Sequence, residues 1–213
     1  MTFAAGQPVP WPVPPDWRRP VRETLAWQTD VLRAATGWTQ HRALRLAPRR
    51  SFTFDVVAEG QERRVADALV ADRGGRGSWA LPVWPDGQRL ASTLAAESTT
   101  VPCATVHRDF TDGGRALLWR SLREWELVQV LAVEETGLQL AMPTAQGWPA
   151  GTRLYPVRVA RLADGADETL WTDLAGRRAM TFVVDEPCDW PAQLPSVTYL
   201  GHPVLQHTSD AGE

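Results

Sequence analysis

An alternation of apolar and polar residues around position 54 constrains the fold of this chain more than any other feature. Phe52, Phe54 and Val56 alternate with Ser51, Thr53 and Asp55. A period of two is typical of a β-strand that has one face on a core and one face toward water. The sequence therefore predicts a half-buried strand here.

The segment before this strand, residues 22–37, has the spacing of a short amphipathic helix. Leu25, Thr29 and Leu32 stand at i, i+4 and i+7, and Gly37 follows where such a helix would end. A connector rich in arginine then leads into the strand; its cations are Arg42, Arg45, Arg49 and Arg50. Such arginines bind phosphate, pair with carboxylates at an interface, or line a solvated edge, and the pattern leaves these three interpretations open.

The rest of the chain adds one further helix and many short strands. Residues 62–72 predict a helix that ends before Gly74, and residues 78–84 predict a strand. From Arg115 onward, short apolar segments alternate with turns, as in a small antiparallel barrel or sandwich. The expected class is α+β, mainly β. An N-terminal helix–strand–helix–strand module would pack with the small β-barrel or sandwich.

Four regions are expected along the chain. A proline-rich arm occupies residues 1–20, an α+β module 21–113, a small β-barrel module 114–190 and an extension 191–213. Proline at this density favours an extended conformation, and Trp11 and Trp17 supply large apolar anchors. The arm either folds back on its own domain or reaches a neighbouring subunit.

Composition excludes several classes of function. The chain has no lysine, which removes the P-loop motif and any Schiff-base chemistry. A net charge of −3 and a pI near 5.8 argue against nucleic-acid binding. The first 15 residues lack the basic and apolar regions of a signal peptide, and no apolar run is long enough for membrane insertion. Cys103 and Cys188 fit either two free thiols or a single bridge.

Signatures of catalysis are missing from the sequence. The four histidines, which are His41, His107, His202 and His207, show no metal-binding spacing, and no serine lies in a nucleophile motif. Glu124 and Glu126 stand two apart on an expected strand, as paired glycosidase acids could. A solvated face is the simpler interpretation of this pair. We therefore expect no enzyme activity, no cofactor and no metal.

Packing and turn residues across positions 7–185 resemble the tail-tip proteins of tailed bacteriophages, that is, the distal tail and minor tail proteins encoded near the tape measure. The residues that carry the resemblance are Trp11-Pro12, Pro15-Asp16-Trp17, Glu23, Trp27, Thr29-Asp30-Val31-Leu32, Gly37, Gln40, Ala43-Leu44-Arg45 and Pro48-Arg49-Arg50. The helix at 62–72, the LPVWPDG run, and Pro149-Ala150-Gly151-Thr152 before Tyr155-Pro156 also fit the family. Thr39 stands where the family has glutamate, and His41 where it has arginine.

The resemblance implies a structural subunit of the virion, at the tail tip, assembled in the host cytoplasm. Such a protein forms a homo-oligomeric ring, with six-fold symmetry expected, that joins the tail tube to the hub and fibres. Its partners would be the tail tube, tape measure and tail hub proteins. The candidate interface residues are Trp11, Trp17, Arg42, Arg45, Arg49 and Arg50. The alternatives are a carbohydrate- or receptor-binding module of the tail tip, or a tail-associated glycan hydrolase.

Overall fold

Strands dominate the structure. The computed structural model describes residues 7–45, 47–163 and 166–187. It is 48% strand and 10% helix, with a single α-helix among those residues. Twelve strands form one sheet, antiparallel except for one short parallel pair. The expected α+β class with an N-terminal helix–strand–helix–strand module is therefore wrong.

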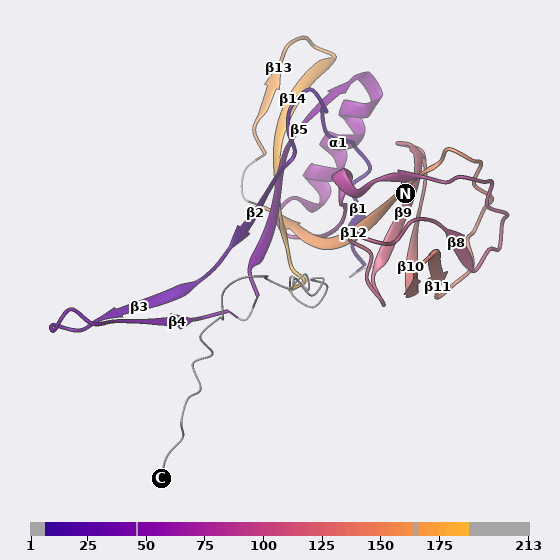
Figure 1. The fold of residues 1–213 in the computed structure, drawn as a ribbon. Coiled ribbons are helices and arrows are strands. Elements are labelled where there is room, and N and C mark those ends of the chain that lie inside the picture. Colours follow the sequence, from indigo (N-terminus) through magenta and orange to yellow (C-terminus); the bar gives the residue numbers. More distant parts are fainter. Residues whose placement is uncertain (1–6, 46, 164–165, 188–213) are drawn as a thin grey trace.

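Eight strands make the main path of the sheet, and Figure 1 labels each of them. In spatial order they are β2 (Arg22–Ala26), β5 (Arg49–Glu59), β14 (Ala175–Val184), β12 (Arg153–Leu162), β9 (Arg115–Ser121), β10 (Glu124–Glu134), β11 (Gly137–Leu140) and β8 (Thr100–Pro102). Off this path, β13 (Glu168–Leu170) pairs with β14, while β6 (Ser78–Pro82) and β7 (Gln88–Arg89) pair with β12. The short strand β1 (Val9–Pro10) runs parallel to β6. Strands on both sides of position 114 thus share one sheet, because β14 lies between β5 and β12.

The helix expected at residues 22–37 is replaced by strands. Strand β2 pairs with β5, and β3 (Thr29–Arg33) pairs with β4 (Thr39–Ala43) in a separate two-stranded hairpin. Three residues at helical spacing are a weak signal, and β-branched Thr24, Thr29 and Val31 favour strands. Pairing with β5 gives β2 the backbone partners that a helix would have supplied from within itself.

Several other sequence predictions are confirmed. The expected strand around Phe54 is β5, and its odd and even positions alternate between half-buried and buried from Ser51 to Ala58. Helix α1 (Gly60–Arg73) lies where residues 62–72 predict it and ends at Gly74, whose φ of 46° suits glycine. The strand at 78–84 is β6, followed by the 3-10 turn η1 (Trp84–Asp86).

Two apolar cores lie on opposite faces of β9 and β12. Along β9, Leu117 belongs to the first core, whereas its neighbours Ala116 and Leu118 belong to the second. Side chains of a strand alternate between faces, so these strands are buried on both sides. Along β12, Leu154 joins the second core and Tyr155 joins the first. This double burial explains the continuous apolar run of β9.

Candidate assembly interface

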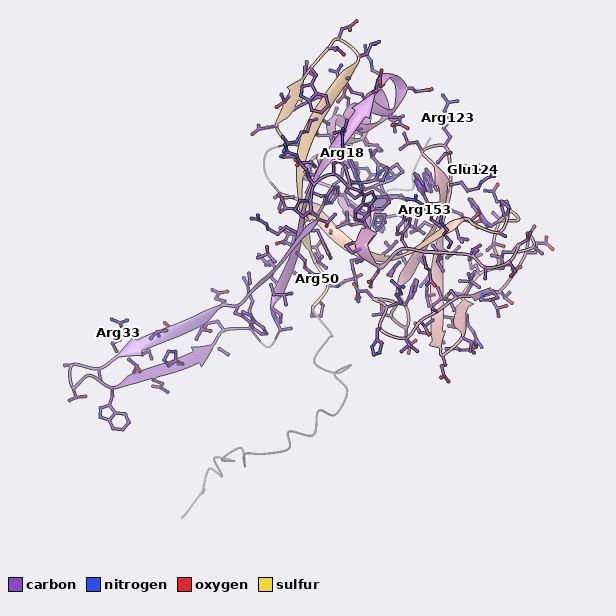
Figure 2. All side chains as sticks on the ribbon, turned by 45° about the horizontal axis from the view of Figure 1, so that its top comes forward. Arg18, Arg33, Arg50, Arg123, Glu124 and Arg153 are labelled. Atoms are coloured by element: carbon purple, nitrogen blue, oxygen red, sulfur yellow. The ribbon has the colours of Figure 1, made fainter. Side chains whose placement is uncertain are left out.

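A two-stranded hairpin projects from the body of the protein. It comprises residues 27–45, with β3 and β4 joined by the turn around Gly37, whose φ is 86°. Figure 1 shows the hairpin reaching well beyond the main sheet, and Figure 2 places Arg33 far from the body. All ten residues of β3 and β4 are exposed. Among the described residues, the hairpin therefore has no core to pack against.

The hairpin carries large apolar side chains into water. Of twelve exposed large hydrophobic residues in the described part of the chain, five lie on it. They are Trp27, Val31, Leu32, Trp38 and Leu44. Trp38, next to the turn, is 80% exposed. Exposed apolar groups concentrated in this way mark interaction sites, and an isolated two-stranded hairpin is marginally stable in water.

The hairpin and the rest of the chain have net charges of opposite sign. Arg33, Arg42 and Arg45 outnumber the single acid, Asp30, so residues 27–45 carry a formal charge of +2. The whole chain carries −3, which leaves −5 for all other residues. No side chain of the hairpin makes a hydrogen bond or an ion pair with another described residue. The hairpin thus exposes both indole rings and cations that have no partner among the described residues, a combination suited to a negatively charged surface.

A buried ion cluster lies at the foot of the hairpin. Arg50 of β5 donates to Glu23 of β2 and to Asp109, and Arg158 of β12 also donates to Asp109. The side chains of Arg50, Asp109 and Arg158 are only 3–6% exposed. Figure 2 shows Arg50 near the junction of hairpin and body.

Further contacts complete this cluster. The backbone N–H of Asp109 donates to Asp86 at 2.8 Å, and the guanidinium of Arg158 lies 3.6 Å from Glu186 at the rim. The Arg50 guanidinium also sits 4.7 Å from the centroid of the Phe52 ring. Buried charges are tolerated only when they are paired and hydrogen-bonded, as they are here. The cluster ties β2 and β5, which lead into the hairpin, to the loop around Asp109.

The six candidate interface residues occupy different environments. Trp11 is fully buried in the first core, with its ring centroid 5.6 Å from that of Trp79 and 5.7 Å from that of Phe182. Trp17 is 55% exposed. The four arginines also separate: Arg42 and Arg49 are exposed, Arg45 is half-buried, and Arg50 lies in the ion cluster. The proline-rich arm thus contributes Trp11 to the fold and leaves Trp17 on the surface.

Sequence reasoning missed the most exposed apolar residues of the hairpin and the acid of the ion cluster. Trp27 lies within residues 22–37, whose spacing predicts a helix, and Trp38 follows the glycine expected to end it. The signal for both was a glycine turn between two segments that contain threonine, which is typical of a hairpin. Asp109 and Arg158 carry no local signal, because they meet Arg50 only through the sheet order.

Glu124 and Glu126, the two acids considered for catalysis, accept hydrogen bonds from nearby groups of the chain. The Glu126 carboxylate accepts from the Ala145 backbone N–H at 2.6 Å and from the Trp148 indole N–H at 2.9 Å. Glu124 accepts from Arg120 at 2.8 Å, and a register shift separates it from Trp125. Both oxygens of Glu126 are therefore already used to fix the loop that leads to β12.

The remaining candidate groups are dispersed. Within the described ranges, no three His, Cys, Asp or Glu side chains are grouped as metal ligands would be. His41 lies on the hairpin and His107 in a loop, whereas His202, His207 and Cys188 fall outside the described residues. Burial raises the pKa of the Cys103 thiol to about 11, which keeps it protonated at neutral pH. In the part of the chain that the structure describes, no helix is long and apolar enough to span a membrane.

Comparison with known proteins finds no match to this chain, either among protein-family models or among curated proteins.

Proposed function

We propose that this chain is a structural subunit of a bacteriophage tail tip that assembles into a ring, with six-fold symmetry expected. In the virion it would join the tail tube to the hub and fibres, with the tube, tape measure and hub proteins as partners. Its role would be mechanical, without catalysis, cofactor or nucleic acid. The resemblance of residues 7–185 to tail-tip proteins suggests this class of protein, and the hairpin supplies the physical argument.

The projecting hairpin is the observation that carries the proposal. Its five large apolar side chains and its net positive charge need a partner surface. The hairpin extends away from the described body of the protein, which supports cover by another molecule (Figure 1). When each copy of a chain docks one surface onto a different surface of the next copy, the contact is heterologous and closes into a ring if the rotation allows.

The ion cluster supports the same proposal. A ring closes only when each hairpin leaves its body in a fixed direction. Arg50 holds the foot of the hairpin to Asp109, and Asp109 is held in turn by Arg158. Because these charges are buried, this connection is little weakened by salt.

The test replaces the two indoles of the hairpin, in the double variant Trp27→Ser/Trp38→Ser. Light scattering after size-exclusion chromatography reports the mass, and negative-stain microscopy reports ring formation. The matched control is Leu131→Ser/Met142→Ser, which removes two exposed apolar side chains from the body. We expect rings from the wild type and the control, and a folded monomer from the hairpin variant. Rings of normal size from the hairpin variant would overturn the proposal.

A further inference from the structure

Two arginines face each other across a short ladder on the body. Arg89 of β7 is the register partner of Arg153 of β12. Side chains directly opposite on paired strands have Cβ atoms about 5 Å apart, and like charges there destabilise the sheet. Among the described residues, neither arginine has a carboxylate within ion-pair distance. This arrangement costs stability, and a ligand of opposite charge would offset that cost.

Both guanidinium groups keep most of their donors free. Arg89 donates from Nη1 to the Gly151 carbonyl at 3.2 Å, and Arg153 donates from Nη1 to the Tyr155 hydroxyl at 3.2 Å. A guanidinium has five N–H donors in a planar fork that matches a carboxylate. The Arg153 group is also held 5.7 Å from the Trp119 ring centroid. These contacts orient the two cations without neutralising them.

Two surface hollows meet at this arginine pair. One has a volume of about 370 Å³ and is lined by Trp17, Trp84 and Tyr155 in addition to Arg89 and Arg153. The other has a volume of about 430 Å³ and adds Trp119, Arg120 and the 149–152 turn to the same two arginines. Volumes of this size suit a small ligand or one unit of a larger one. Figure 2 places Arg153 on the body, away from Arg33 of the hairpin.

The aromatic wall of the first hollow is fixed from behind. The rings of Trp84 and Tyr155 pack edge to face with their centroids 4.9 Å apart. A Cβ on Gly87 would lie 2.2 Å from the Tyr155 ring, so glycine is what allows η1 to approach that ring. Trp17, in contrast, leaves more than half of its surface open to solvent beside the arginines. An exposed indole next to two free guanidinium groups offers a flat apolar face and a carboxylate receptor together.

We propose that this arginine–tryptophan site binds a carboxylate-bearing saccharide. A sugar ring would lie on Trp17, and its carboxylate would bridge Arg89 and Arg153. An extended acidic peptide fits less well, since both edges of β12 are already paired here, with β7 and β9. Assembly through the hairpin does not depend on this site, so each proposal can fail without affecting the other.

The experiment measures binding of trigalacturonic acid to the full chain by isothermal titration calorimetry. Its methyl ester serves as the uncharged probe, and tetraglutamate serves as the acidic peptide. The test variant is Arg89→Gln/Arg153→Gln. The matched control, Arg64→Gln/Arg76→Gln, removes two exposed arginines that have no acidic partner among the described residues. A third variant, Trp17→Ala, tests the stacking face.

We expect the wild type and the control to bind trigalacturonic acid, and the test variant to bind at least about tenfold more weakly. The methyl ester and tetraglutamate should bind at least tenfold more weakly than trigalacturonic acid, and Trp17→Ala should weaken binding of the sugar. An absence of wild-type binding would overturn the proposal. Equal affinity for tetraglutamate, or unchanged affinity in the test variant, would do the same. Circular dichroism on each variant checks that the fold is retained.

Discussion

Strands β5 and β3, which have 11 and 5 residues, both contain β-branched residues but differ completely in burial. Every second residue of β5 from Arg50 to Ala58 is buried, whereas every residue of β3 is exposed. The difference lies in their neighbours: β5 has β2 and β14 on its two edges and a core on one face, while β3 has only β4. Both strands therefore have hydrogen-bonded partner strands, and only β5 is also buried. The body is stabilised by its own core, and the exposed hairpin is the surface that we propose docks onto another subunit.

The largest expected effect comes from the two tryptophans of the proline-rich segment, because one is in the core and one is not. Trp11→Ala should lower the free energy of unfolding by about 3–5 kcal/mol, since a large ring is lost from a close-packed core. Trp17→Ala should change it by less than about 0.5 kcal/mol. Urea denaturation of the two variants measures the difference. Equal losses would contradict the division into buried and exposed anchors.

The ion cluster gives the next largest effect. Asp109→Asn should lower the free energy of unfolding by about 3 kcal/mol, because two buried arginines lose their shared carboxylate. This value is the lower end of the range for broken buried pairs, since Glu23 and Glu186 remain. Asp30→Asn on the hairpin is the matched control and should have almost no effect. If both variants melt like the wild type, the cluster does not hold the foot of the hairpin.

Hydrogen exchange sharpens the comparison of the two strands directly. In the isolated subunit, amides of β3 and β4 should exchange far faster than those of β5 and β14, because marginal hairpins open locally. Ring assembly should slow exchange in the hairpin and leave β5 unchanged. Mass spectrometry of peptides from each region reports both rates. Equal protection of β3 and β5 in the monomer would show that the hairpin is stable by itself.

The smallest effect concerns thiol chemistry. The Cys103 thiol has its pKa raised to about 11 by burial, so its alkylation at pH 8 should be slower than that of an ordinary thiol. The comparison uses the Cys188→Ser background with and without Thr36→Cys, which places a thiol at the exposed hairpin turn. Iodoacetamide should modify the hairpin thiol first.

The same raised pKa has a consequence for stability. The folded chain holds the Cys103 proton more tightly than the unfolded chain does, so this stabilisation is complete below the ordinary thiol pKa. It is lost as pH rises from about 9 to about 11. Unfolding of the Cys188→Ser variant should therefore become easier across that window, and the additional change Cys103→Ala should remove this part of the pH dependence.

The sequence alone determined the features that depend on neighbouring residues. The alternation around Phe54 set the faces of β5, the glycine at position 74 ended α1, and the turns after position 114 separated successive strands, although β10, β12 and β14 are longer than expected. Local patterns also collected Arg42, Arg45, Arg49 and Arg50 into one group. Each of these conclusions rests on a repeat or a turn signal a few residues long, which needs no knowledge of the rest of the chain.

Only the tertiary structure decided the rest. The spacing in residues 22–33 predicted a helix, but residues 22–26 pair with the edge of β5 and residues 29–33 pair with β4. Arg49 and Arg50 are neighbours in sequence, yet Arg49 is exposed and Arg50 is buried, because successive side chains of β5 point to opposite faces of the strand. Asp109 lies on the face of Arg50 and pairs with it. Arg89 and Arg153 are more than sixty residues apart in sequence and become neighbours through the pairing of β7 with β12. Such pairings depend on strand order, which no local pattern encodes.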